Sequence, residues 1–338
     1  MTATLEAPVT TAPAQVTPAQ TEPISSNDSK SFTSRQAPWL KLGPQIDGDV
    51  NAAEAAALGG LDFEVELRAA SFSSVSDKGN KMSRTVTTRK AIIRSDTEEF
   101  FDFVSVDYVP VQYGDAFTFM DEINPRYVAA GVMSGGRQGF VVAQLPDVSQ
   151  IPLEINGVVD PHDYYVILRT SHDRSKAMEI SLMPLRGLCM NQLALNSMMQ
   201  SAPQRWSIKH IGDVKDKMVE AQRVLKTAPK YAEIFAAKAR QLGSVTVTDE
   251  DSRSILKRVL PDKVKRDEMI DAIMSTYHND PTVGFVGTGW GLANAVSTYY
   301  DWGRNDGTRT DQSKFTSGLT GDTAKYFNRT AQLILNRA

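Results

Sequence analysis

The segment YYVILRTSHDRSKAMEISLMPLRGLCMNQLALNSMM, residues 164–199, predicts a β-hairpin followed by a helix. Tyr164–Arg169 is a nearly continuous apolar run, which is typical of a strand covered on both faces. In Met178–Leu182 apolar side chains alternate with polar ones, the period of a half-buried strand. The polar turn between the two strands lets them pair. Pro184 has no amide hydrogen to donate, so we expect it to end the ladder before the helix.

The turn of this hairpin contains His172 and Asp173, which permit two interpretations. In the first, they belong to a metal-dependent phosphohydrolase site, although the distant His and Asp partners of such a site are not recognisable. In the second, Asp173 accepts backbone hydrogen bonds within the turn while His172 packs on a neighbour. The second interpretation accounts for the pair without any chemistry.

Three blocks of this region resemble a known family. They read YY-x-x-L-R-x-S-H-D-x-S at 164–175, M-P-L-R-G-L-C-M-N-Q-L at 183–193 and R-W-S-I-K-H at 205–210. Together with Gly287–Gly291 and Asn294 they are similar to the phage/plasmid-like protein family, a domain of unknown function. The resemblance runs from about Asp62 to the C-terminus.

The chain departs from this family at Arg174, where the family's S-H-D-G-S turn has a glycine. An arginine at the tip of a turn suits an anionic partner. By fold analogy and typical phage context, the family also resembles the phage single-strand annealing proteins of the Red-beta and RecT type. The resemblance therefore implies a DNA-binding protein of phage or plasmid recombination.

Composition limits the classes of function. The chain has 338 residues, 41% of them hydrophobic, so it can bury a sizeable core. The formal charge of -3 means that any anion-binding surface must be local. A single cysteine excludes a disulfide framework and a cysteine-based zinc site, and it fits a reducing cytoplasm. No apolar run approaches the roughly 18–20 residues that span a bilayer, and no signal peptide is recognisable.

The predicted fold is a mixed α+β protein, in which an antiparallel β-sheet with hairpins is packed by helices and followed by a helical C-terminal part. Residues 1–36 are poor in large apolar side chains and predict a disordered tail. Residues 37–60 predict a short N-terminal arm, distinct from any later hairpin, which Trp39 and Leu40 anchor and which contains a short helix at Ala52–Leu58. Residues 61–245 form the predicted α+β core domain, and residues 246–338 the helical region.

Shorter elements follow from local patterns. Strands are expected at Phe63–Leu67 and Tyr108–Gln112, and Ser134–Arg137 predicts the turn of another hairpin. Asp306–Ser317 is rich in polar, acidic and basic side chains and predicts a mobile loop. Pro229 is expected either to kink a long charged helix or to restart it.

A basic β-hairpin is the first candidate for a binding surface. From Lys78 to Arg94 the chain has six basic residues and no acidic one, in a segment rich in β-branched side chains. Neutralisation of phosphates by Lys and Arg supplies most of the affinity in sequence-independent nucleic acid binding. The alternative is an edge strand that charge protects from aggregation. Basic residues fall on both faces of the strand, so the sequence does not say which of them point outward.

A second basic cluster surrounds the central hairpin and the strand at 205–209, where Trp206 is interleaved with basic residues. The candidate nucleic-acid contacts of both clusters are Lys81, Arg84, Arg89, Lys90, Arg94, Arg174, Lys176, Arg186, Arg205 and Lys209.

No paired carboxylates, serine elbow, zinc spacing or dinucleotide fingerprint is recognisable, so we expect no catalytic residue, metal ligand or cofactor. The expected function is to bind single-stranded DNA and to anneal complementary strands without ATP, in the cytoplasm of a bacterial host. We expect a homo-oligomer, either a ring or a filament, that works with a phage exonuclease or a host single-strand-binding protein and with no membrane. The alternatives are a metal-dependent nuclease and a non-catalytic regulatory or structural phage protein.

Overall fold

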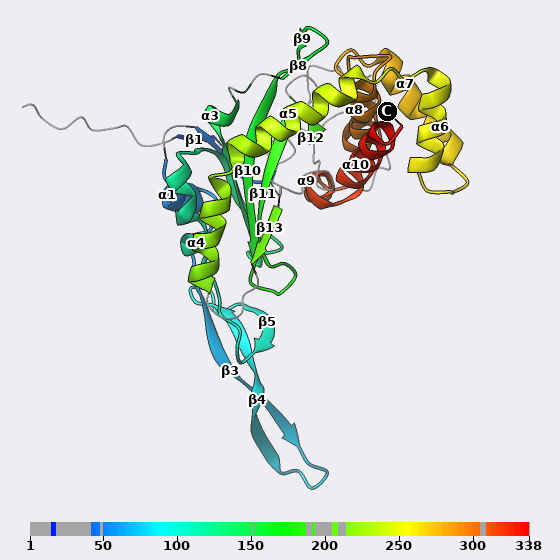
Figure 1. Ribbon diagram of the computed structural model, residues 1–338. Coiled ribbons are helices and arrows are strands. Elements are labelled where there is room, and N and C mark those ends of the chain that lie inside the picture. Colours follow the sequence, from blue (N-terminus) through cyan, green and yellow to red (C-terminus); the bar gives the residue numbers. More distant parts are fainter. Residues whose placement is uncertain are drawn as a thin grey trace, which may run out of the picture.

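The chain folds into a large antiparallel sheet flanked by helices, with a smaller sheet that extends into a long hairpin (Figure 1). The computed structural model describes residues 15–17, 42–47, 50–149, 151, 153–186, 191–192, 205–208, 214–304 and 309–337. Antiparallel sheets occupy the N-terminal half and helices the C-terminal part, so the predicted α+β class is confirmed.

The large sheet is built around the predicted central hairpin. Its order is β1-β2-β6-β7-β10-β11-β12, with β13 also paired to β11. The strands are β1 (Gln15–Thr17), β2 (Gln45–Asp47), β6 (Arg126–Met133), β7 (Gln138–Gln144), β10 (His162–Ser171), β11 (Met178–Arg186), β12 (Asn191–Gln192) and β13 (Arg205–Ile208). Every described pairing is antiparallel, as expected for strands joined by hairpins.

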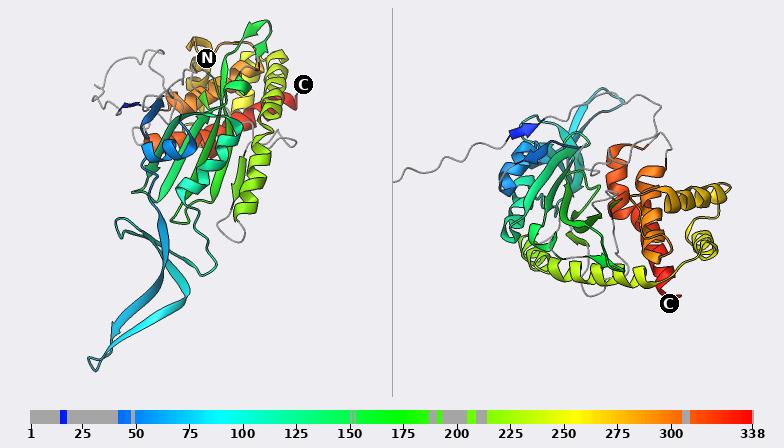
Figure 2. Two further views of the ribbon diagram at one scale, coloured as in Figure 1. Left: turned by 90° about the vertical axis from the view of Figure 1, so that its left-hand side faces the viewer. Right: turned by 90° about the horizontal axis from the view of Figure 1, so that it is seen from above.

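The smaller sheet has the order β3-β4-β5. Its strands are β3 (Val65–Val75), β4 (Lys81–Arg94) and β5 (Phe100–Ser105). β5 pairs only with Arg89–Ile93, so the outer halves of β3 and β4 form a two-stranded ribbon, which we call the arm. Figure 2 shows the arm projecting away from the rest of the molecule. A third pair, β8 (Glu154–Ile155) and β9 (Val158–Val159), forms a small hairpin.

The helices lie mostly after the sheets. They are α1 (Ala52–Leu58), α2 (Tyr113–Thr118), the 3-10 helix η3 (Phe119–Ile123), α3 (Pro146–Ser149), α4 (Val214–Leu225), α5 (Ala228–Ser244), α6 (Asp249–Val259), α7 (Arg266–Asn279), α8 (Gly289–Thr298), the π-helix η5 (Tyr299–Gly303), α9 (Asp311–Thr320) and α10 (Asp322–Leu335). Figure 2 shows α5 leading from the large sheet to the group of helices α6–α10.

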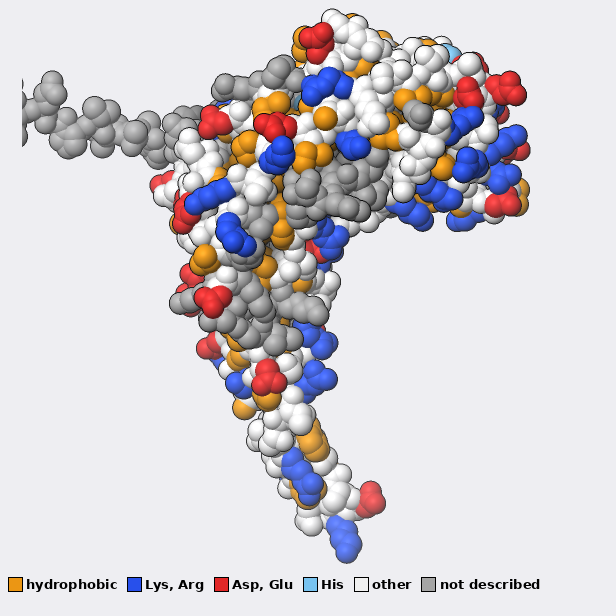
Figure 3. Space-filling view, in the orientation of Figure 1, with side chains coloured by type: hydrophobic (Ala, Val, Ile, Leu, Met, Phe, Trp, Pro, Cys, Tyr) orange, Lys and Arg blue, Asp and Glu red, His pale blue; other side chains and the backbone are white. Residues whose placement is uncertain are grey.

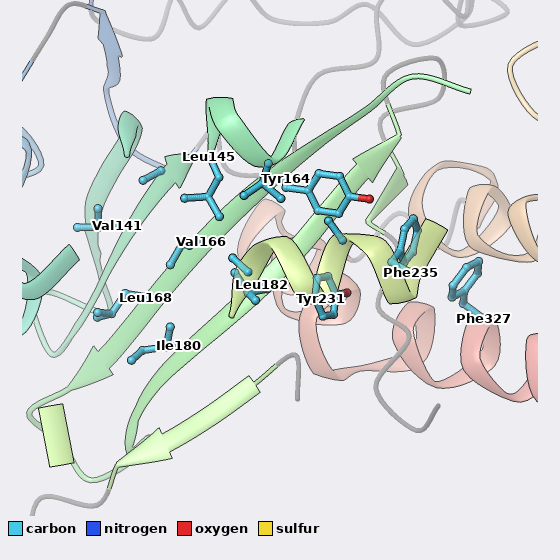
Figure 4. Packing of buried hydrophobic residues seen from close by; sticks show 14 of the residues in the cluster. Val141, Leu145, Tyr164, Val166, Leu168, Ile180, Leu182, Tyr231, Phe235 and Phe327 are labelled. Atoms are coloured by element: carbon cyan, nitrogen blue, oxygen red, sulfur yellow. The ribbon is translucent and has the colours of Figure 1, made fainter. Parts of the chain in front are cut away.

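Both faces of the central hairpin are buried. On one face Val166 and Leu182 lie beside α5, where the rings of Tyr164 and Phe235 meet edge to face at 6.1 Å (Figure 4). On the other face Ile167 belongs to a second apolar cluster, which also contains side chains of α9 and α10. β11 is consequently buried along its whole length, and the prediction that it is half-exposed is wrong.

Pro184 does not end β11. It pairs with Tyr164, and the strand continues to Arg186. β13 pairs with Met178–Ser181 and β12 with Leu185 and Arg186, so no described strand needs a hydrogen bond from the proline on that side.

Two further predictions are wrong. The predicted mobile loop contains the start of α9, whose N-cap Thr310 accepts a hydrogen bond from the Ser313 amide at 3.2 Å and whose Phe315 is completely buried. The predicted strand at Tyr108–Gln112 does not form. Instead the side-chain amide of Gln112 pairs with the backbone of Val65, a distant residue in β3.

Several predictions are confirmed. The short helix occupies the predicted residues Ala52–Leu58 and begins with a capping box at Asn51. Ser134–Arg137 connects β6 and β7, and α5 starts beside Pro229. Two short strands contradict the predictions for their segments: β1 lies in the predicted disordered tail, and β12 lies in the segment predicted to be a helix after Pro184. The rest of these two segments lies outside the described residues, as do Trp39 and Leu40. Among the helices that are described, none is long and apolar enough to cross a membrane.

Candidate nucleic-acid interface

The arm begins and ends in well-defined local structure. At its tip the Gly79 amide donates to the Ser76 carbonyl at 2.8 Å, and the Ser76 amide donates to the Asn80 carbonyl at 2.9 Å. Gly79 has φ +78°, which glycine adopts without strain. At the base of the ribbon a bulge interrupts the ladder, because Ala69 pairs with Lys90 whereas Ala70 pairs with Val86. β4 therefore has three extra residues between these two pairs.

The bulge decides which side chains share a face. Beyond it Arg84 pairs with Phe72, and Met82 pairs with Ser74, so Phe72, Met82 and Arg84 lie on one face of the arm. Phe72 is 52% exposed and Met82 is 44% exposed. Lys81 lies on the opposite face. A simple alternation along the whole of β4 would have placed Arg84 and Lys90 together, which the bulge prevents.

Four cations of the hairpin are exposed and uncommitted. They are Lys78, Lys81, Arg84 and Arg89. None of their side chains forms a hydrogen bond or ion pair with any residue that the structure describes. Asp77 is the one acidic residue between Ala69 and Lys90. Figure 3 shows Lys and Arg side chains spaced along the arm, with hydrophobic side chains between them.

The other two predicted residues of this hairpin lie nearer the body. Lys90 is half-buried beside the bulge. The Arg94 guanidinium lies 3.8 Å from the ring centroid of Phe63, and its Nε donates to Asp96 at 2.6 Å. Arg94 therefore stabilises the base of the arm, and we remove it from the contacts that a nucleic acid would use.

The turn of the central hairpin contains two more predicted residues. Arg174 has φ +60°, the left-handed region that favours the glycine of the resembling family. Its side chain is half exposed, and its Nε donates to Asp102 of β5 at 2.7 Å. Lys176 is half-buried, and burial together with the nearby Arg169 guanidinium lowers the pKa of its ammonium group.

Arg186 and Arg205 are both ion-paired. Arg186 is fully buried, and its Nε donates to Asp160 at 2.7 Å, so it cannot contact a nucleic acid without unfolding. Arg205 is partly exposed, and it shares Glu179 with the buried Arg169. Lys209 lies outside the described residues.

His172 and Asp173 have the geometry of the structural interpretation. The His172 ring is buried, 4.2 Å from the ring centroid of Tyr113, and it also lies near Phe63 and Phe101. Asp173 accepts a hydrogen bond from the Ser175 amide at 2.9 Å within the turn. Among the residues that the structure describes, no group of three or more His, Cys, Asp or Glu side chains is placed to hold a metal ion.

A buried polar network that the sequence did not predict connects the sheet to α8. Asp160 accepts hydrogen bonds from Arg186 Nε and from Trp290 Nε1, both at 2.7 Å. Its carbonyl oxygen lies 2.8 Å from His162 Nδ1. The glycines around Trp290 reflect close packing, since a Cβ at Gly291 would lie 2.2 Å from the Phe285 carbonyl oxygen. In the sequence, only Trp290 and the glycines around it indicate this network.

His162 makes this network sensitive to acid. Burial lowers the pKa of its imidazole to about 4, against 6.5 when exposed. Between these values the unfolded chain binds a proton that the folded chain excludes, so stability falls as the pH drops. We expect a loss of about 3 kcal/mol between pH 6.5 and pH 4, at roughly 1.4 kcal/mol per unit. Urea unfolding at several pH values measures it.

The control for this prediction is His162→Phe. Carboxylates titrate in the same range, so only the difference between the two proteins reports on the imidazole. The variant should show a flatter pH profile. Parallel profiles for both proteins would contradict the assignment.

Comparison with known proteins gives one match. A family model described as a domain of unknown function, DUF932, matches residues 101–320. No curated protein and no solved structure matches the chain. The matched region begins in β5 and ends with α9, so it contains most of the large sheet but not the arm.

Proposed function

The chain belongs to the DUF932 family, a family of unknown function, and we propose that this member binds single-stranded DNA through its β3–β4 arm. The supporting observation is the group of uncommitted cations Lys78, Lys81, Arg84 and Arg89. Every other predicted cation of the described residues has an acidic partner or is at least half-buried. Cations that the fold does not use are available to phosphates.

The face of the arm that contains Arg84 suits a single strand better than a duplex. Exposed Phe72 and Met82 offer apolar surface for unstacked bases, while Arg84 lies beside Phe72 in the ladder. Proteins that bind single strands without sequence preference combine such stacking surfaces with cations along the backbone path. In a duplex the bases are not free to stack on a side chain.

The wider proposal is that the protein anneals complementary strands without ATP, as an oligomer in phage or plasmid recombination. The phage/plasmid-like resemblance and the analogy with annealing proteins of the Red-beta and RecT type support it. Binding through ion pairs with the phosphates leaves the base edges available for pairing with a second strand. In the bacterial cytoplasm, a phage exonuclease would generate the single strand, or a host single-strand-binding protein would coat it.

The test of the binding surface uses Arg84→Ala and Arg89→Ala. Each lost phosphate contact should lower the slope of log affinity against log salt by about 0.7 for a single strand. Titration of a labelled oligonucleotide at several salt concentrations, without nucleotide, measures this slope. Stability should change by less than about 0.5 kcal/mol, because both side chains are exposed.

The matched control is Arg253→Ala. Arg253 is also an exposed arginine, but it lies in α6 and pairs with Asp271. It should leave the salt slope unchanged. Equal effects of Arg84→Ala and Arg253→Ala, or binding that does not depend on salt, would refute the assignment of the arm.

A further inference from the structure

The outer part of the arm has an unusually open construction. Ala70–Val75 pair with Lys81–Val86, and β5 does not reach this ribbon. Of these twelve residues only Ala70 is buried. Two strands alone in water are marginally stable at best, whereas three or more support one another. Pairing with an additional strand would therefore stabilise the ribbon.

The structure fixes which backbone groups of β3 face its free edge. Gln112 hydrogen-bonds to both the amide and the carbonyl of Val65, so the polar groups of Val65 point away from β4. At the tip the Ser76 amide donates to Asn80, so the groups of Ser76 point towards β4. The extra residues of the bulge lie in β4, so the alternation along β3 is continuous between these two ends. The outward-facing residues are therefore Leu67, Ala69, Ser71, Ser73 and Val75.

Only this edge of the small sheet is unprotected. On β5 the Arg137 guanidinium donates to the Phe100 carbonyl at 3.0 Å, and the Phe103 amide donates to its neighbour Asp102. The free edge of β4 beyond the bulge carries Lys81 and Arg84. By contrast, β3 reads AASFSSVS at 69–76, with no charge, proline or glycine. Natural sheets protect their edges with charge or proline, and an edge without them is a site of strand addition.

We propose that two copies of this chain associate by antiparallel pairing of their β3 edges, with Phe72 opposite Phe72 of the second copy. In this register Ser71 pairs with Ser73, and Ala69 with Val75, through their outward-facing amides and carbonyls. The Phe72 pair occupies a non-hydrogen-bonded position, where opposite side chains lie closest. Arg68 and Asp77 fall outside the paired segment.

A second copy fits this edge because the edge is self-complementary. An antiparallel pairing around a two-fold axis presents the same uncharged segment from both sides, so no like charges face each other. The two Arg84 side chains lie on outer strands, separated by three strand spacings, about 14 Å. This exceeds the Debye length of about 8 Å at physiological salt, so their repulsion is weak. The pairing requires no DNA, although it would unite the cations of two arms on one four-stranded ribbon.

The experiment compares Ser73→Pro with Ser83→Pro by sedimentation velocity without DNA, from about 1 to about 100 μM. The two serines pair with each other, and both amides point away from the ladder, so neither proline removes a hydrogen bond within the arm. The wild type should dimerise with a Kd on the order of micromolar, as expected of a contact below about 1,200 Å². Ser73→Pro should raise this Kd at least about tenfold, whereas Ser83→Pro should not change it. A monomeric wild type, or equal dimerisation of both variants, would overturn the pairing.

Cysteine crosslinking tests the register. In a Cys189→Ser background, which removes the one native thiol, Phe72→Cys should form a covalent dimer on mild oxidation, whereas Ser83→Cys should not. A non-hydrogen-bonded pair places the two Cβ atoms about 4.5–5.5 Å apart, close to the spacing of a disulfide. Equal crosslinking at both positions would reject the β3 edge. Because neither measurement involves DNA, failure here leaves the salt-slope test of DNA binding unaffected.

Discussion

Replacing Arg186 by alanine is expected to lower the free energy of unfolding by about 3–5 kcal/mol. The ion pair between Arg186 and Asp160 is completely buried, with both side chains 0% exposed. Removal of the guanidinium leaves the Asp160 carboxylate in the core with only the Trp290 indole as a described side-chain donor. An unpaired buried charge is far more destabilising than a missing surface contact. Urea unfolding followed by circular dichroism measures the change.

Arg174→Ala is the matched control. Arg174 also forms an ion pair at 2.7 Å, with Asp102, but half of its side chain is exposed. Water compensates for the loss of such a pair, so its removal should change stability by less than about 1 kcal/mol. Similar losses for the two variants would show that burial does not determine the strength of these pairs.

The sequence predicts the main elements because apolar periodicity reports burial directly. Tyr164–Arg169 lies in a strand covered on both faces, and Ala52–Leu58 is a helix. The burial of both faces of β11 could not be predicted in the same way. Its second face is covered by α9, where Phe315 and Leu319 are the only large apolar side chains in an otherwise polar segment. Two apolar side chains in a polar segment do not predict a buried helix unless the sheet that they pack against is known.

The candidate site was predicted in part, and for a physical reason. Charge counting identifies the basic hairpin, but it does not distinguish the exposed Arg84 from Arg94, which pairs with Asp96. The pairing of Phe72 with Arg84 depends on a bulge that adds residues to one strand only, and no pattern within β4 encodes its partner's register. Similarly, the sequence does not distinguish Arg186 from an exposed cation, because its ion pair with Asp160 forms only in the folded protein.

Excising the arm is expected to have the largest effect on DNA binding. Ala70 and Val86 form a hydrogen-bonded pair about 5.5 Å apart at Cα, so an Asn-Gly turn can join them in place of residues 71–85. The excision removes Lys78, Lys81 and Arg84, three of the four uncommitted cations, together with the apolar surface of Phe72. The salt slope for a single strand should fall by about 2, and the affinity at low salt by two orders of magnitude or more.

Stability distinguishes loss of the binding surface from loss of the fold. The excised residues 71–85 contain no buried side chain, and the buried Ala70 is retained, so the thermal midpoint should remain within a few degrees of the wild type. A second variant, Phe72→Ser with Met82→Ser, keeps every cation and removes only the apolar surface. It should weaken binding by about 1–3 kcal/mol per stacked base without changing the salt slope. If the armless protein binds single strands as tightly as the wild type, the assignment of the arm is wrong and the binding surface lies elsewhere on the protein.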